Sequence, residues 1–196
     1  TKDEVLAREP QLKSEGLQGG GVYLDYRNND ARLVIENIKQ AVADGAHAVS
    51  RVQAVGFLYN DEGKITGIQA KDLLTDEQFE IHADVVINTT GPWSDKLRGL
   101  DKNDSFTPQM RPTKGVHLVV DKSRLNVPQP TYFDTGKQDG RMVFVVPREE
   151  KTYFGTTDTD YHGDFQHPTV EQSDVDYLLE VVNNRYPEVD RKSTRL

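Results

Sequence analysis

The chain has 196 residues, of which 35% are hydrophobic and 29% charged, with a net charge of −8 and no cysteine. The acidic charge argues against a surface for nucleic acid or anionic membranes, and the lack of cysteine excludes disulfides and thiolate chemistry. No apolar run has the length of a membrane span and no signal peptide is visible, so we expect a cytoplasmic protein.

Two helices are predicted in the first 45 residues. The first covers residues 2–9 and is stopped by a proline. The second covers residues 30–44, where apolar side chains recur at the spacing of a single buried stripe. Asn29 is its expected N-cap, and Gly45 is its expected C-terminal stop.

A glycine-rich turn at residues 17–21 lies between these helices. It precedes an expected strand at residues 22–26, whereas a dinucleotide-binding glycine loop follows a strand and opens a helix. This turn is therefore not interpreted as a nucleotide loop. After the second helix, Val-rich and aromatic segments separated by turns predict an antiparallel meander of three strands, at residues 49–59, 64–74 and 79–82.

Residues 84–95 join an apolar segment to a predicted helix start. Val85, Val86 and Ile87 have the composition of a short strand buried on both faces. Gly91 breaks the strand, and Pro92 restarts the chain as a short helix. Such a junction is where α/β folds place nucleotide phosphates, although an ordinary strand–turn–helix connection is the more frequent explanation of such a stretch.

The second half of the chain predicts longer strands than the first half, followed by a helix. A polar connection at residues 100–108 suggests a domain seam. A helix is expected at residues 170–186, with Thr169 or Ser173 as its cap. Longer strands, which favour a second and mostly antiparallel sheet, are expected at residues 111–120, 131–133, 141–146 and 151–157. The predicted fold class is α+β.

One of these strands contains a histidine shortly after two cationic residues. Alternation places His117 and Val119 on one face of the strand. Arg111 and Lys114 lie upstream and give a cationic approach to the imidazole. This grouping is able to hold a small anion while the imidazole transfers a proton near neutral pH. The alternative is a histidine that only packs on the sheet.

Polar side chains also gather between residues 155 and 167. Hydroxyls and carboxylates at residues 155–160 form either local turns or a strand end that projects into a substrate cavity. His162 and His167 have aspartates nearby, but such loops are usually solvated, and no metal site is expected. No Gly-x-Ser-x-Gly motif is present, so a serine hydrolase is not indicated.

Several motifs in a fixed order resemble one flavoprotein superfamily. They are Asp30–Val34 opening a helix that ends at Gly45-Ala46, Asn88-Thr-Thr-Gly-Pro-Trp93, Lys114-Gly-Val-His117, Val143-Phe-Val-Val-Pro147 and Phe154-Gly-Thr-Thr-Asp-Thr-Asp160. Together they resemble the D-amino-acid-oxidase-like flavoproteins. Within these, they are most similar to FAD-dependent glycerol-3-phosphate dehydrogenases, in particular the α-glycerophosphate oxidase branch.

The resemblance implies that the chain is an internal fragment. Members of the family begin with a βαβ unit bearing a glycine-rich FAD loop and continue to a G-x-R-P-L segment, and neither is in this sequence. Residues 1–100 are expected to be part of the FAD-binding domain and residues 104–190 part of the substrate-binding domain, with residues 191–196 as a tail. Weak or no FAD binding and no turnover are expected of the chain alone.

The resemblance also implies an activity and a set of site residues. The intact protein would oxidise glycerol 3-phosphate to dihydroxyacetone phosphate through FAD, with oxygen (giving hydrogen peroxide) or a quinone as acceptor. His117 would be the base or a hydrogen-bond partner of the substrate. Substrate contacts are expected from Lys114, Arg111 and Thr157, and cofactor contacts from Thr90, Gly91 and Val52.

Other interpretations stay open at this point. The chain is also compatible with another oxidase of the superfamily, of the amino-acid or sarcosine type, or with a non-catalytic acidic binding module. The oligomeric state is open, with a homo-oligomer as one alternative. A dehydrogenase would be peripheral at the membrane.

Overall fold

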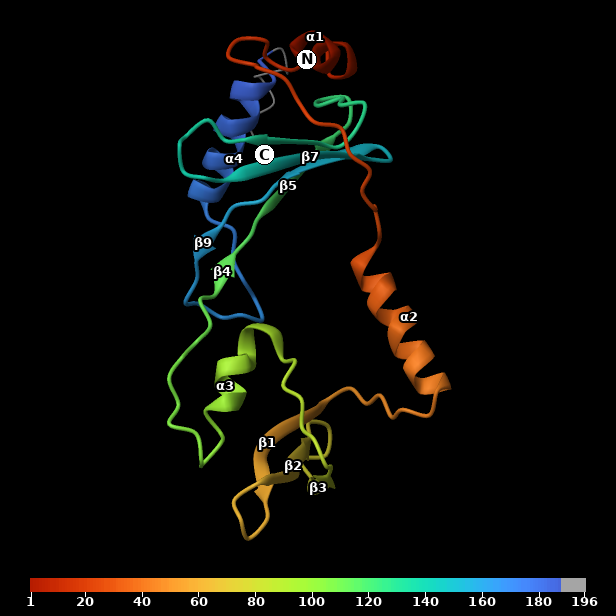
Figure 1. Cartoon of the computed structure of the whole chain (residues 1–196), viewed down its shortest axis with the longest axis vertical. Helices are drawn as coiled ribbons and strands as arrows, with labels where there is room; N and C mark the ends of the chain where they lie inside the picture. Colours follow the sequence, from red (N-terminus) through yellow and green to blue (C-terminus); the bar gives the residue numbers. More distant parts are fainter. Residues whose placement is uncertain (188–196) are drawn as a thin grey trace. The chain divides into compact units, whose positions relative to one another are not determined.

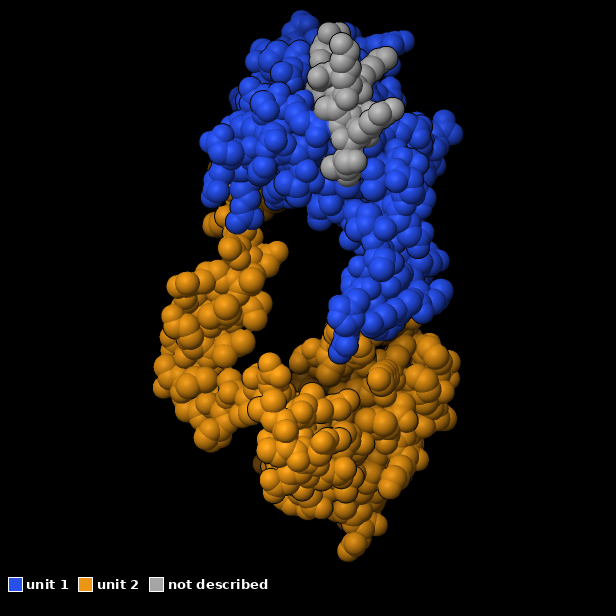
Figure 2. Space-filling view, turned by 180° about the vertical axis from the view of Figure 1, so that it is seen from behind, with its two compact units in different colours: residues 1–23, 111–196 blue, residues 24–110 orange. Residues whose placement is uncertain are grey.

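A computed structural model describes residues 1–187 of the chain (Figure 1). The chain divides into two compact units, coloured separately in Figure 2. The meander unit is Leu24–Met110, and the sheet unit joins Thr1–Tyr23 to the described residues from Arg111 onward. The tail predicted at residues 191–196 lies outside the described residues, and the expected FAD and substrate roles of residues 1–100 and 104–190 stay predictions.

The meander unit contains the predicted antiparallel sheet. Strands β1 (Val52–Tyr59), β2 (Ile65–Asp72) and β3 (Gln78–His82) pair in the order β1-β2-β3. The β1–β2 turn is closed by the Asn60 side chain, whose carbonyl oxygen accepts from two backbone N–H groups of the turn. Gly63 completes the turn at φ +77°, a conformation that glycine adopts without steric cost.

Helix α2 (Asp30–Ala43) forms as predicted, but its apolar stripe is not buried. The side chain of Asn29 caps it by accepting from the backbone N–H of Arg32 at 3.1 Å, and Gly45 follows it at φ +98°. The large side chains of the stripe, Val34, Ile35, Ile38 and Val42, are 46–56% exposed. The prediction of a buried stripe is wrong for the described residues, because no element among them packs against this face.

Two expected strands do not form. Residues 22–26 have no strand conformation, and Leu24 and Tyr26 are almost fully exposed. The same is true of residues 84–87, where Val85 and Ile87 are more than 70% exposed. A strand requires a hydrogen-bonded neighbour, and no segment of residues 1–187 pairs with either stretch.

The helix expected after Pro92 is present in two short pieces. A 3₁₀ turn, η1 (Gly91–Trp93), has Pro92 at a position where its missing N–H costs nothing, and α3 (Ser94–Arg98) continues from it. None of the helices in the described part of the chain is long and apolar enough to cross a membrane.

The sheet unit is built on four antiparallel strands in the order β5-β8-β7-β6. Their bounds are His117–Asp121 for β5, Thr131–Asp134 for β6, Met142–Arg148 for β7 and Lys151–Gly155 for β8. This confirms the predicted second sheet. The strand expected at residues 111–120 is in fact two, because the chain leaves the ladder at Gly115 and Val116. Its first part, β4 (Thr113–Lys114), pairs with β9 (Thr159–Asp160) instead.

Two helices complete this unit. Helix α1 (Lys2–Arg8) confirms the first predicted helix and is capped by Thr1. Helix α4 (Gln172–Arg185) begins later than expected, and neither Thr169 nor Ser173 is its cap. The cap is Glu171, whose backbone N–H donates to the carboxylate of Asp174 at 3.0 Å.

The core of the sheet unit lies between α4 and one face of the four strands. Apolar side chains alternate along the strands, so that every second one points to the helix. The buried cluster consists of Val116, Leu118, Leu125, Val127, Val143, Val145, Phe154, Leu178, Val181, Val182 and Tyr186. The opposite face of the same strands is therefore free to carry a site.

We expect Val143→Ala to destabilise the sheet unit by about 2–3 kcal/mol, because it removes two methyl groups from a fully buried position. Val119→Ala is the matched control, since Val119 is 58% exposed on β5, another strand of the same sheet. Urea denaturation of both variants measures the difference. Equal losses in the two variants would contradict the assignment of the core face.

Candidate functional site

His117 lies on the face of the sheet that points away from the core. Along β5 the exposed His117 and Val119 alternate with the buried Leu118, which confirms the predicted faces. Opposite His117 across the ladder is Gly155 of β8. The ring of Tyr153, two residues earlier on β8, meets the imidazole edge-on, with centroids 5.7 Å apart and planes at 76°.

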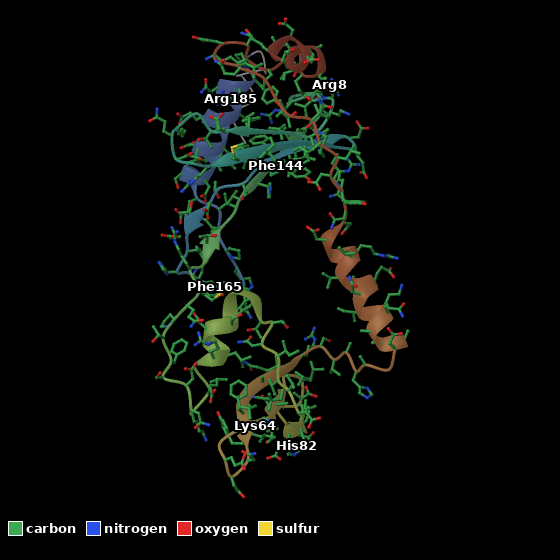
Figure 3. All side chains as sticks on the ribbon, viewed as in Figure 1. Arg8, Lys64, His82, Phe144, Phe165 and Arg185 are labelled. Carbon is green, nitrogen blue, oxygen red and sulfur yellow. The ribbon has the colours of Figure 1, made fainter. Side chains whose placement is uncertain are left out.

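An aromatic row continues across the other strands from this histidine. Gly155 pairs with His117 on one side and with Phe144 of β7 on the other, and Phe144 pairs with Tyr132 of β6. The rings of Phe144 and Tyr132 stack with centroids 4.1 Å apart, and both are at least 40% exposed. Phe144 is labelled in Figure 3. The site face thus has an imidazole at one end, two aromatic rings at the other, and a glycine between them.

Lys114 does not share this face. Its side chain is 5% exposed and its ammonium nitrogen lies 2.7 Å from the carboxylate of Asp174 at the start of α4. It also donates to the backbone carbonyl of Thr169 at 2.9 Å. Lys114 therefore does not provide the positive charge that was predicted near the imidazole of His117. Its ammonium group is bound to Asp174 and to the carbonyl of Thr169 instead.

This ion pair perturbs both partners. The hydrogen bond to Asp174 raises the pKa of Lys114, against the opposing effect of its burial. Burial disfavours the charged form of Asp174, but the hydrogen bonds from Lys114 and from the backbone of Glu171 together hold the pKa of Asp174 below its usual value. Both groups are consequently charged at neutral pH, and they fix β4 to α4.

The other two predicted substrate residues have different surroundings. Arg111 is 81% exposed, and its guanidinium contacts the carboxylate of Asp160 at 2.8 Å. Thr157 is buried, and its hydroxyl oxygen accepts from the backbone N–H of Val116 at 3.0 Å. The same hydroxyl donates to the carbonyl of Lys114 at 3.4 Å. Thr157 thus supports the chain just before His117, while Arg111 presents a charge to solvent.

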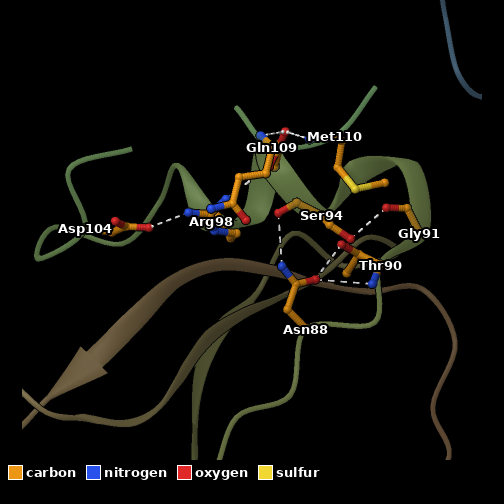
Figure 4. A network of polar contacts seen from close by, with 9 residues as sticks. Asn88, Thr90, Gly91, Ser94, Arg98, Asp104, Gln109 and Met110 are labelled. Atoms are coloured by element: carbon orange, nitrogen blue, oxygen red, sulfur yellow. Dashed lines mark hydrogen bonds and ion pairs between the residues drawn. The ribbon is translucent and has the colours of Figure 1, made fainter. Parts of the chain in front are cut away.

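The predicted cofactor residues belong to the meander unit. The side-chain oxygen of Asn88 accepts from both the N–H and the hydroxyl of Thr90, at 3.2 and 2.8 Å (Figure 4). Its amide nitrogen donates to the carbonyl of Ser94 at 3.0 Å. Gly91 has φ +57°, and a Cβ added there would meet nothing within 4 Å. Hydrogen bonds between its own residues stabilise the turn. Open space lies next to the backbone at Gly91.

Two polar residues that sequence reasoning did not select organise the neighbouring helix. Asp95 of α3 accepts from the backbone N–H groups of Gln109 and Met110, both at 2.8 Å, and the bond from Met110 is the main reason that the pKa of Asp95 is lowered. Arg98 pairs with Asp95 and with Asp104 (Figure 4). Asn88 belongs to one of the family motifs but was not selected as a site residue, although an asparagine directly after an apolar segment is a common turn-forming signal.

A small pocket of about 220 Å³ adjoins this network in the meander unit. It is lined by Phe57, Ile65, Val86, Asn88, Arg98, Asp101 and Asp104. Val52, the third predicted cofactor residue, opens β1 and pairs with Asp72. Because β1 is an edge strand of its sheet, one side of its backbone is not used by β2.

The loop histidines do not form a metal-binding group in the structure. His167 lies 2.9 Å from the carboxylate of Asp164, with both side chains exposed. No cluster of three or more potential metal ligands occurs within residues 1–187.

Comparison with known proteins places these observations in a family context. The family model described as FAD dependent oxidoreductase matches residues 1–195. An α-glycerophosphate oxidase of Enterococcus casseliflavus is 73% identical over 187 residues, which are 95% of this chain and 31% of that protein. The corresponding protein of Lactococcus lactis is 66% identical over 188 residues, or 96% of this chain and 31% of its own length.

A solved structure is similar over the whole chain. It is the glycerol-3-phosphate dehydrogenase of Bacillus halodurans complexed with FAD, with 44% identity and a TM-score of 0.82. The match covers 100% of this chain and 38% of that one. The chain therefore spans about a third of the length of the curated relatives that it matches.

Replacing Lys114 with Met is expected to lower stability by leaving the buried Asp174 without its partner. The raised pKa of Lys114 means that its contribution is present below about pH 10.4 and is lost as the pH rises through the folded value. The lowered pKa of Asp174 means that its contribution is present above about pH 3.9 and is lost as the pH falls through the folded value.

Urea midpoints of the unchanged chain and of Lys114→Met, measured across pH, test this expectation. Their difference should be constant at intermediate pH and shrink at both extremes. Lys137→Met is the control, because Lys137 pairs with the exposed Glu180 and such pairs contribute about 0–1 kcal/mol. An equal effect of the two substitutions would refute the structural role of Lys114.

Proposed function

Because the chain belongs to the FAD-dependent oxidoreductase family, we propose that the complete protein oxidises glycerol 3-phosphate to dihydroxyacetone phosphate, with FAD as its cofactor and oxygen as electron acceptor. The observation that carries this proposal is the 73% identity to an α-glycerophosphate oxidase over 95% of the chain. The solved glycerol-3-phosphate dehydrogenase complexed with FAD supports the same substrate and cofactor.

The turn at residues 88–91 fits one part of such a cofactor. Gly91 has a positive φ and open space where a side chain would be, which allows a ligand to approach the backbone closely. Thr90 and Gly91 are the proposed contacts, with the edge of β1 near Val52 as a third. No strand–glycine–helix unit of the phosphate-binding type occurs among residues 1–187, so these residues hold only part of an FAD site.

Oxidation of the substrate converts a secondary alcohol into a ketone. The hydroxyl proton leaves to a base while a hydride leaves carbon 2. When bound, FAD would accept that hydride and later pass the two electrons to oxygen, which with two protons gives hydrogen peroxide. We assign the proton to His117, the imidazole on the exposed face of the sheet unit.

The phosphate of the substrate requires positive charge. Arg111 is the proposed contributor from this chain, because its guanidinium is exposed, although Asp160 neutralises part of its charge. Lys114 and Thr157 support substrate binding indirectly, since their polar groups are bound to α4 and to the backbone before His117. Arg111 alone is a weak phosphate site, so further cations are expected from the rest of the complete protein.

Two other functions were compatible with the sequence. The non-catalytic binding module loses its support, because the family that matches the chain is one of oxidoreductases. An oxidase acting on amino acids or sarcosine stays as the alternative substrate class. A quinone as acceptor, with a peripheral membrane location, is the alternative to oxygen. A cytoplasmic location and a homo-oligomer are part of the proposal.

We expect His117→Asn in the complete protein to lower kcat/KM for glycerol 3-phosphate about 100-fold or more, since a positioned general base contributes roughly 10²–10⁴-fold. Hydrogen peroxide release measures the rate, and substitution of a quinone analogue for oxygen distinguishes the acceptors. His82→Asn is the control, because His82 is exposed at the end of β3 in the meander unit. Oxidation of an amino acid or sarcosine in preference to glycerol 3-phosphate would overturn the proposed substrate.

The chain of 196 residues by itself is expected to bind FAD weakly or not at all and to show no turnover. Its described residues supply turn and strand-edge contacts without a glycine-rich loop for the pyrophosphate. Titration of the purified chain into FAD, followed by flavin fluorescence, measures this binding. Saturable quenching at submicromolar concentration would contradict the expectation.

A further inference from the structure

We propose that Gly155 and Tyr153 of β8 are positioning residues that hold the imidazole of His117 in one orientation on the sheet face. The proposal rests on the proposed role of His117 as the base of the reaction. Neither residue needs to touch the substrate. Each acts on the imidazole through a contact that the structure describes.

The first contact comes from the absence of a side chain at Gly155. A Cβ built there would lie 2.7 Å from Cδ2 of His117 and 2.6 Å from the carbonyl oxygen of Val116. Such distances do not occur between real atoms, so the imidazole occupies the volume that any other residue would fill. The ring lies directly over the backbone of β8, and it is Gly155 that makes this position available.

The second contact comes from Tyr153, the diagonal neighbour of His117 across the β5–β8 pair. Its ring meets the imidazole in a T-shaped arrangement, which the charge distribution of aromatic rings favours. Tyr153 is half-buried, whereas His117 is exposed, so the tyrosine is the more firmly held of the two. The rotation of the imidazole is thus restricted on the sheet side by the backbone of β8 and on another side by the ring of Tyr153.

The backbone before His117 is also fixed. The hydroxyl of Thr157 accepts from the N–H of Val116, and the carbonyl of Val116 accepts from the N–H of Thr157 at 3.4 Å. The Cα of His117 therefore has a defined place, and the remaining freedom is rotation of the side chain. Gly155 and Tyr153 limit that rotation, which is what a proton acceptor needs in order to meet a substrate hydroxyl in a constant geometry.

The histidine ring signals of the 196-residue chain, observed by NMR, test the contacts without any cofactor or activity. The signal of His117 is identified by its loss in His117→Gln. Tyr153→Ala should shift this signal, because the nearby ring is removed, and Tyr153→Phe should restore it. Tyr132→Ala is the matched control, since Tyr132 is an exposed aromatic residue of the same face that stacks on Phe144 instead.

Gly155→Ala should move the same signal further, because the added methyl group displaces the imidazole. If this variant does not fold, the two Tyr153 variants decide the question. An unchanged His117 signal in Tyr153→Ala, or a shift equal to that in Tyr132→Ala, would overturn the proposal.

Kinetics of the complete protein separate this inference from the proposed function. Tyr153→Ala is expected to lower kcat roughly two- to tenfold, the equivalent of one edge-to-face aromatic contact, with little change in KM, and Tyr153→Phe to restore it. If the NMR shift occurs while His117→Asn leaves the oxidation of glycerol 3-phosphate unchanged, the positioning holds and the proposed role of His117 fails. If His117→Asn is inactive and Tyr153→Ala is fully active with an unshifted signal, the positioning fails and the base assignment stands.

Discussion

The packing of α4 against one face of the β5-β8-β7-β6 sheet is the constraint on which the rest of the sheet unit depends. Leu178, Val181 and Val182 fill the space between helix and strands, and the alternation of the strands then directs every other side chain to the opposite face. His117 is exposed because Leu118 is buried. The position of the candidate base is therefore a consequence of hydrophobic burial one residue away.

The Lys114–Asp174 ion pair extends this packing to β4. A lysine among apolar residues would be costly if unpaired, and the carboxylate at the start of α4 removes that cost while tying the strand to the helix. Thr157 then binds the two residues that flank Gly115. Lys114 and Thr157, two residues from different motifs for which substrate binding was predicted, thus have their polar groups bound inside the protein. They affect the site through the backbone that bears His117.

In the meander unit, hydrogen bonds contribute more to the structure than the burial of apolar side chains does. Its sheet is held by strand pairing, whereas the turn at residues 88–91 and the start of α3 are held by hydrogen bonds of Asn88 and Asp95. The apolar side chains of α2 and of residues 85–87 are largely exposed, although their composition is that of a protein interior. The hydrophobic pattern of a segment predicts which of its faces is to be buried. Whether that face is buried depends on other residues that pack against it.

The sequence by itself determined the local elements: the helices, the meander, the second antiparallel sheet and the two faces of β5. These depend on side-chain periodicity and on caps and turns, such as Asn29 and Gly63, which act over a few residues. It also determined the family, because motifs in a fixed order are a property of the sequence.

Only the tertiary structure decided what each polar side chain contacts. Lys114 and Asp174 are 60 residues apart in the numbering, and His117 and Tyr153 come from different strands, so neither contact leaves a local signal. The same holds for burial, which failed as a prediction for α2 and residues 84–87 because it depends on partners elsewhere in space. Local order is encoded in neighbouring residues, whereas the site results from register and packing between distant ones.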